Sequence, residues 1–192
     1  IYSKDTSKIV KLNPSSVLSS LSLYTQNQTS MTTSSQSMMT NYINVFKELS
    51  DNKRLINSTY DILAGRLPEN KDEVVLIADS YGEISDYTLY SIGIKDQQEL
   101  TDMMIKIMQG QTVESPTQTS YTYDELLETE FKLILNTDYY QKEGNTWIDK
   151  SKDEEYMKNI IDNGLTLKVV GIIKPNDESS NQTSGEIGYT SE

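Results

Sequence analysis

Two uninterrupted apolar runs, at residues 74–77 and 169–173, constrain the fold of this chain more than any other feature. Side chains of a strand alternate between its two faces, so a run without polar residues is expected where both faces are covered. We therefore predict strands over residues 73–78 and 165–173; the second alternates at first, with Thr166 and Lys168 outward, and then becomes fully apolar. Two further strands are predicted, at residues 60–63 and 131–135. With helices between them, the chain is predicted to be an α+β protein with mixed sheets and short helices.

The spacing of apolar residues predicts helices in four places. The strongest covers residues 96–109, with Asp96 and Glu99 as a capping box and Gly110 at its end. Its apolar face is rich in methionine, and we interpret it as core; it carries Leu100, Met103, Met104, Ile107 and Met108. A second capped helix is predicted over residues 151–162, with a box formed by Ser151 and Glu154. A short helix, interrupted near residues 50–52, is predicted within residues 42–56, and a weaker helix that Gly93 stops is predicted over residues 84–93.

The chain divides into segments of different character. Residues 15–40 are rich in Ser and Thr and are predicted to form a mobile loop. Residues 42–80 and 121–175 are predicted to form the structured core, with residues 81–120 as a helical insertion. A short strand is expected at residues 9–10 and a hairpin turn at residues 141–145, whereas no element is predicted in the polar tail after residue 175. The lack of a signal peptide and of a membrane-spanning run indicates that residues 1–192 are a soluble fragment of something larger.

Composition restricts the chemistry of the chain. A net charge of −12, from 17 basic and 29 acidic residues, disfavours nucleic acid and anionic lipid headgroups as partners and is compatible with cationic peptides. Cysteine and histidine are both absent, so disulfides, ordinary zinc sites and catalytic triads that need these residues are excluded. We predict no enzymatic activity, no catalytic residue, no cofactor and no metal site.

Three groups of residues could still carry chemistry. A group that is loosely similar to a calcium loop lacks its central glycine and is better explained as a helix cap; it comprises Asp149, Ser151, Asp153 and Glu154. A group of carboxylates could act as a glycosidase pair, although an acidic chain supplies such groups by chance; it comprises Asp124, Glu125, Glu128 and Glu130. A set of tyrosines could form a stacking surface for peptide or sugar, or the edge of a thin core; it comprises Tyr81, Tyr87, Tyr90, Tyr121, Tyr123, Tyr139 and Tyr140.

The order of motifs around the apolar runs resembles a known family. Residues 60–77 combine a strand, a Gly-Arg-Leu-Pro turn, an acidic residue and an apolar strand, and residues 167–175 answer with a Val-Val-Gly-Ile strand. The residues that form this structural signature are Gly65, Arg66, Pro68, Val170 and Gly171. The arrangement resembles the extracellular, MacB-like periplasmic core domain of FtsX-like and MacB-like permeases of Firmicutes, the membrane subunits of one class of ABC transporters. Together with segments at 120–140, the resemblance covers roughly residues 42 to 190.

The signature residues have expected physical roles. Gly65 is expected to adopt a positive φ in the turn and Pro68 to fix the path of the chain after it. Gly171 is expected to allow a close backbone approach within a strand.

The resemblance implies a domain between the first two transmembrane helices, with a porter-like lobe and an inserted second lobe. Its expected location is the outer face of the cell membrane of a Gram-positive bacterium. Its expected partners are its own transmembrane helices and an ABC ATPase domain, in a transporter that is a dimer, and a peptide is a candidate substrate. The chain has no Walker lysine loop, so ATP binding is not expected of it. The alternative is a stand-alone bacterial surface module for binding or adhesion.

Overall fold

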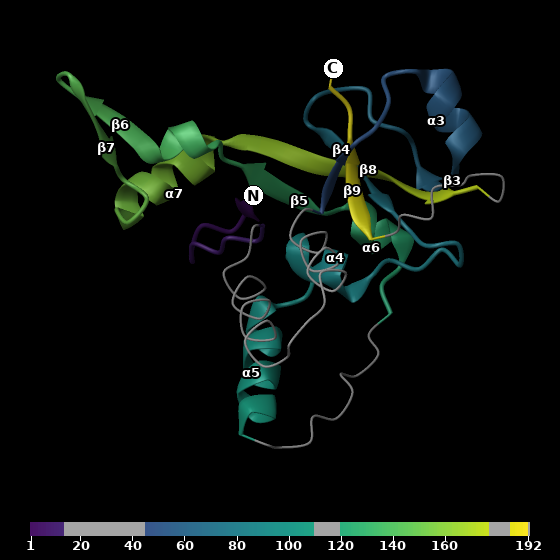
Figure 1. Cartoon of the computed structure of the whole chain (residues 1–192), viewed down its shortest axis with the longest axis horizontal. Coiled ribbons are helices and arrows are strands. Elements are labelled where there is room, and N and C mark those ends of the chain that lie inside the picture. The colour runs from purple at the N-terminus through teal and green to yellow at the C-terminus, as the bar shows by residue number, and fades with distance from the viewer. Residues whose placement is uncertain (14–44, 110–119, 177–184, 192) are drawn as a thin grey trace, which may run out of the picture.

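The computed structural model describes residues 1–13, 45–109, 120–176 and 185–191 (Figure 1). The main sheet comprises the strands β1 (Tyr2–Ser3), β2 (Phe46–Glu48), β3 (Tyr60–Gly65), β4 (Glu73–Ile77), β5 (Glu130–Leu133), β8 (Leu165–Pro175) and β9 (Glu186–Tyr189). The helices are α3 (Lys53–Thr59), α4 (Asp86–Ser91), α5 (Gln97–Met108), α6 (Tyr123–Leu127) and α7 (Glu154–Asn163), with a 3-10 turn η1 (Asn136–Tyr139). The predicted α+β class, with a mixed sheet and short helices, is confirmed. The predicted loop at residues 15–40 lies outside the described residues.

The strand β8 joins the other strands into one sheet of order β1-β5-β8-β4-β9-β2. Along one edge its first half pairs antiparallel with β5 and its second half pairs antiparallel with β3. Along the other edge it pairs parallel with β4, which in turn pairs with β9. The strands predicted around residues 60, 73, 131 and 165 are therefore all present.

Every residue of β4 is buried, and its side chains alternate between two hydrophobic clusters. Val74 and Leu76 enter a cluster that α4 and α6 cover on one face of the sheet. Val75 and Ile77 enter a second cluster on the opposite face, together with Ile56 of α3. The uninterrupted apolar run is thus a strand covered on both faces, as predicted.

A β-bulge at Val170 reverses the side-chain alternation of β8. Val74 pairs with Val169 but Val75 pairs with Gly171, so Val170 is an extra residue in β8. Before the bulge, Leu167 and Val169 enter the cluster covered by α4 and α6, and after it Ile172 does so. The bulge therefore decides which residues of the second half of β8 face each cluster.

The two helices for which capping boxes are predicted, α5 and α7, are present, but their N-caps differ from the prediction. The N-cap of α7 is Asp153, whose carboxylate accepts a backbone N–H of the first turn, and not Ser151. Before α5, Asp96 accepts the N–H two residues on, at 2.9 Å, and the Glu99 carboxylate instead accepts the Tyr90 hydroxyl at 3.3 Å. The side chains of the methionine stripe on α5 lie outside the described residues.

Three strands lie where the sequence predicted other structure. Phe46–Glu48 falls in the predicted helix at 42–56 but forms β2, parallel to β9, and the helical part of that range begins only at Lys53. The Phe46 ring lies edge-on to Phe131 and Tyr189, so contacts far apart in sequence override the local spacing. The prediction of a strand at residues 9–10 is wrong, because the first strand, β1, lies earlier in the chain. The strand β9 lies in the tail, where no element was predicted.

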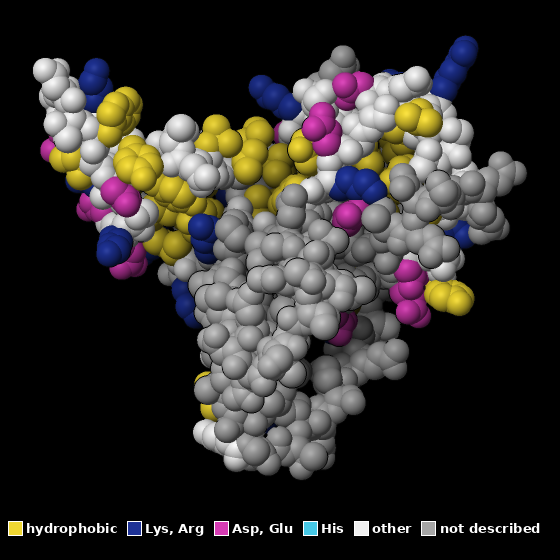
Figure 2. Space-filling view, viewed as in Figure 1, with side chains coloured by type: hydrophobic (Ala, Val, Ile, Leu, Met, Phe, Trp, Pro, Cys, Tyr) yellow, Lys and Arg dark blue, Asp and Glu magenta, His cyan; other side chains and the backbone are white. Residues whose placement is uncertain are grey.

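A separate hairpin of β6 (Tyr140–Glu143) and β7 (Thr146–Asp149) projects from the body beside α7 (Figure 1). Gly144 turns it with a φ of +62°, so the predicted hairpin turn is present, although residues 141–143 of the predicted range belong to β6. Every residue of both strands is exposed. Figure 2 shows hydrophobic side chains gathered on this arm, and Trp147 is 64% exposed.

The position of β9 can be tested at Ile187, which is fully buried between β4 and β2. We expect Ile187→Ala to lower the free energy of unfolding by about 2–5 kcal/mol, because it removes methyl groups from the core and leaves a cavity. Urea denaturation measures the effect. Ile148→Ala on the exposed hairpin is the matched control and should cost less than about 0.5 kcal/mol. Equal midpoints for the two variants would contradict the placement of β9.

Candidate functional site

Four of the five signature residues, Gly65, Arg66, Val170 and Gly171, meet where the end of β3 pairs with β8 at its bulge. Gly65 has a φ of +68° and pairs with Gly171. A Cβ on Gly171 would collide with the carbonyl oxygen of Arg66, and a Cβ on Gly65 would collide with the carbonyl oxygen of Val170. The Arg66 N–H donates to that Val170 oxygen at 2.9 Å. Backbone therefore fills the space beside both glycines, which leaves no room for a side chain.

The Glu73 carboxylate closes the turn that follows. It accepts hydrogen bonds from both terminal nitrogens of Arg66, at 2.7 Å (Nη1) and 2.5 Å (Nη2). It also accepts the backbone N–H of Glu69 at 2.8 Å and the N–H and side-chain amide of Asn70 at 3.3 and 3.2 Å. The Glu73 side chain is 9% exposed, whereas that of Arg66 is 46% exposed. One buried carboxylate thus holds both ends of the turn.

These contacts lower the pKa of Glu73 from its ordinary value of 4.5 to about 2. The largest cause is the hydrogen bonding from Arg66, and burial opposes it. The Glu69 N–H, the Asn70 amide and the positive charge of Arg66 lower the pKa further. Glu73 is therefore ionised at any physiological pH, and the turn stays closed.

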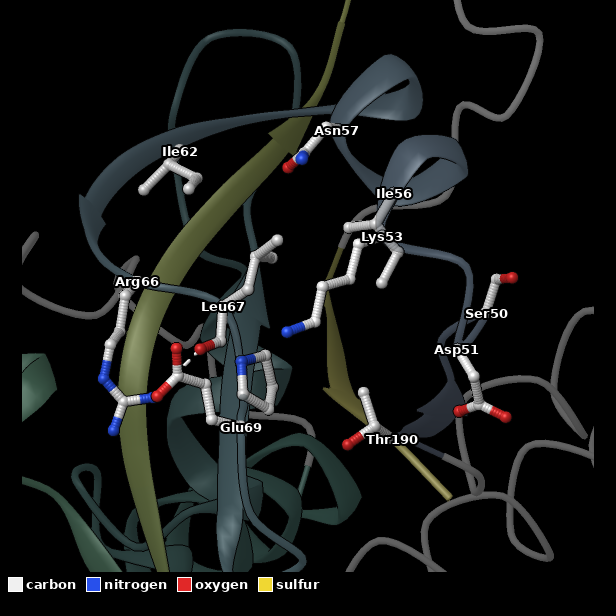
Figure 3. Close-up of a pocket in the computed structure, with 11 residues that line it drawn as sticks. Ser50, Asp51, Lys53, Ile56, Asn57, Ile62, Arg66, Leu67, Glu69 and Thr190 are labelled. Carbon is white, nitrogen blue, oxygen red and sulfur yellow. Dashed lines mark hydrogen bonds and ion pairs between the residues drawn. The ribbon is translucent and has the colours of Figure 1, made fainter. Parts of the chain in front are cut away.

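A cavity of about 230 Å³ opens beside this turn (Figure 3). It is lined by α3 and the segment before it, by β3, by the turn itself and by the residue that follows β9. Its apolar lining comes from Ile56, Ile62, Leu67 and Pro68. Pro68 is buried, so the predicted fixed point of the turn is also a wall of the cavity.

Charged residues around the cavity differ in whether they already have partners. Asp51 accepts the Ser191 N–H at 3.4 Å and the Ser191 hydroxyl at 2.8 Å. Arg66 is held by the turn, and Glu69 lies 3.9 Å from one Arg66 nitrogen. Lys53 has no ion pair or hydrogen bond with another described residue, and Figure 3 shows its side chain extending from α3 toward the turn. The cavity therefore contains one cation that is available to a ligand.

The acidic residues singled out in the sequence serve as caps and surface pairs. Glu125 forms a capping box with Thr122 at the start of α6, and Glu130 pairs with Lys4. Asp149 accepts the backbone N–H of the residue two positions later, as in an ordinary turn. Among the described residues no group of three or more acidic side chains is placed to hold a metal ion. The calcium-like segment is thus a turn followed by the cap of α7.

The tyrosines do not share one surface. Tyr90 is buried, and the Tyr123 hydroxyl donates to the carbonyl of Gly82 at 2.9 Å. Tyr139 is within 3.0 Å of the Tyr2 hydroxyl. Tyr81, in contrast, is 89% exposed. Most of the described side chains of this set therefore belong to the edges of the core, one of the two alternatives that the sequence left open; the side chain of Tyr87 lies outside the described residues.

The sequence does not predict the roles of two residues of the site. Glu73 is the acidic residue before the apolar strand in the motif at residues 60–77, but no ion pair is predicted for it, although an acidic residue that opens a buried strand close after a turn arginine is a signal for such a pair. Lys53 gave no signal, because its position in the cavity depends on how α3 packs against the sheet.

Comparison with protein-family models, curated proteins and solved structures finds no match for this chain. Among the described residues, none of the helices is long and apolar enough to cross a membrane.

The close approach at the bulge makes a prediction for Gly171. We expect Gly171→Ala to lower the free energy of unfolding by about 1–3 kcal/mol, and Gly171→Val by at least as much, because the added Cβ meets backbone that cannot rotate away. Chemical denaturation measures both variants. Gly171 does not have a positive φ, so a loss of stability in these variants reports crowding by the added side chain and not backbone strain. An unchanged midpoint for both Gly171 variants would contradict the close approach.

The lowered pKa of Glu73 makes a prediction for acid stability. A carboxyl group whose pKa is lowered in the folded state stabilises the fold above pH 4.5 and loses that effect as pH falls toward 2. Glu73→Gln should therefore flatten the pH dependence of stability in this window and cost about 1–3 kcal/mol at pH 7. The control is Glu69→Gln. Because the Glu69 side chain is 64% exposed, this variant should change the free energy of unfolding by less than about 0.5 kcal/mol. Parallel acid profiles for the wild type and Glu73→Gln would contradict the role of Glu73.

Proposed function

We propose that the chain is the extracellular domain, or a fragment of it, of an FtsX-like or MacB-like ABC transporter permease. In this proposal the domain lies on the outer face of the cell membrane of a Gram-positive bacterium. Its partners are the permease's own transmembrane helices and the ABC ATPase domain, and the full transporter is a dimer. The domain handles substrate or transmits motion driven by ATP hydrolysis, and it performs no chemical step itself.

The observation that carries this proposal is the meeting of both motif segments in one unit. Gly65 and Arg66 of the first segment contact the bulge at Val170 and Gly171 of the second, and Glu73 holds the turn between β3 and β4. The residues on which the family resemblance depends thus serve a single structural purpose. This agreement between sequence order and contact supports a shared fold element over a chance order of short motifs.

The sheet is suited to transmitting motion. Figure 1 shows β8 crossing the molecule from the α7 side to the α3 side. This strand of 11 residues is hydrogen-bonded to β5 and β3 on one edge and to β4 on the other. Close-packed interiors have low compressibility, so a displacement at one end of such a strand is passed on to the other.

The alternative, a stand-alone surface module for binding or adhesion, is favoured by the β6–β7 hairpin. Tyr140, Trp147 and Ile148 are 46%, 64% and 37% exposed there, on strands that no other described element covers. Large amphipathic side chains presented in this way are typical of contact surfaces. A binding role for the hairpin would not need transmembrane helices or an ATPase.

Residues 1–192 contain no cysteine, so labelling that appears in a variant but not in the unmodified protein reports the location of the introduced cysteine. In the parent bacterium, Tyr81→Cys in the native protein should react with a membrane-impermeant maleimide in intact cells, since residue 81 is 89% exposed. Ser91→Cys is the matched control, because residue 91 is fully buried and should react only after denaturation. Labelling of Tyr81→Cys only after lysis would contradict the extracellular location.

The same strain separates the two functions. The transporter proposal predicts that the labelled protein stays in the membrane after an alkaline carbonate wash and co-purifies in mild detergent with an ABC ATPase. A surface module would be labelled equally in intact cells but would purify without an ATPase. The second result would replace the transporter proposal with the alternative.

A further inference from the structure

We propose that the cavity beside the turn binds the C-terminal residue of a peptide, with its carboxylate on Lys53 and an apolar side chain on the opposite wall. The ligand class is a basic peptide that ends in a branched apolar residue with a free carboxylate. The inference goes beyond the proposed function, because such a site would operate in a permease domain or in a free surface module alike.

The apolar side of the ligand follows from the walls of the cavity. Ile56 of α3 is 5% exposed and belongs to a buried hydrophobic cluster, and Leu67 of the turn packs against the same cluster. Ile62 of β3 also lines the cavity and is 48% exposed, although the sheet residues around it bury their apolar side chains. Covering such surface with a branched aliphatic group removes apolar area from water, at about 25 cal/mol per Å².

The anionic side of the ligand follows from the free cation. Of the four charged residues that line the cavity, Asp51 and Glu69 have partners and Arg66 is held by Glu73. Lys53 alone has no partner within the described part of the chain. A carboxylate is the group that an ammonium ion in this setting binds best among the termini and side chains of peptides.

Neutral polar groups complete the site. The Asn57 amide of α3 and the Thr190 hydroxyl after β9 both line the cavity, and neither side chain is hydrogen-bonded to another described residue. Figure 3 shows Lys53 between these two side chains along the α3 side of the cavity. They can donate to the second carboxylate oxygen or accept the last peptide N–H.

The size of the cavity and the net charge of the protein restrict what the rest of the ligand can be. A cavity of about 230 Å³ is smaller than a typical site for a drug-sized molecule, so it accepts one residue and leaves the remainder of the peptide outside. The net charge of −12 repels an isolated anion and attracts basic residues. A basic peptide with a free C-terminal carboxylate satisfies both the local cation and the overall charge.

The test compares two probes on the isolated chain. Acetyl-Lys-Lys-Leu is offered with a free C-terminal carboxylate or as its amide, and binding is followed by ¹H–¹⁵N chemical shifts. General attraction to an acidic protein favours the amide, because both probes carry two lysine ammonium groups but the amide lacks the negative carboxylate. The proposed site instead predicts that the free acid binds about fivefold more tightly than the amide, with shifts centred on α3 and the turn. Tighter binding of the amide would overturn the proposal.

Three variants assign the roles of the side chains. Lys53→Gln, at an exposed position, should remove the preference for the free acid, whereas Lys142→Gln on the hairpin should keep it. Ile62→Ser should weaken both probes by a similar factor, because it affects only the apolar wall. Retention of the preference in Lys53→Gln would overturn the proposal, and the spectra of each variant establish that it is folded. Failure of binding leaves the maleimide labelling unaffected, so the two proposals fail separately.

Discussion

The bulge at Val170 is the constraint on which the rest of the structure depends. One extra residue in β8 lets this strand place apolar side chains in one cluster before the bulge and in both clusters after it. The same bulge directs the Val170 carbonyl toward the Arg66 N–H and brings Gly171 against Gly65. Contacts with β8 therefore fix the path of the chain from β3 into β4. At two positions, Gly65 and Gly171, only glycine allows these contacts.

The ion pair of Arg66 and Glu73 extends this constraint to the surface. Glu73 is buried at the start of β4, so its charge requires the nearly complete set of donors that the turn supplies. Arg66 is partly exposed and lines the cavity, although its charge is directed to Glu73. The arginine thus joins the core of the sheet to the wall of the cavity, and this arrangement leaves Lys53 as the cation that a ligand can reach.

The parts of the fold that the sequence predicted are those in which local pattern and final environment agree. The strand β4 and the second half of β8 are apolar because both faces are covered, and the turn after Gly65 carries its own conformational signal. The strands β2 and β9 gave no usable signal. Each has three or four residues, and each is a strand only because it pairs with the other and because β9 pairs with β4. Such non-local pairing is absent from any short window of sequence.

Only the part of the candidate site that has a local sequence signal could be predicted. The signature residues were predictable, because glycine and proline have positional meaning within a turn or a strand. The cavity was not, since Lys53 and Thr190 reach it from segments that meet only after β2 and β9 have paired. The strands β2 and β9, which the sequence did not predict, therefore help to position the residues that line the cavity. A ligand in the cavity would contact the signature turn and the α3 side together, and its binding would favour the arrangement of β2, β9 and β3 seen here.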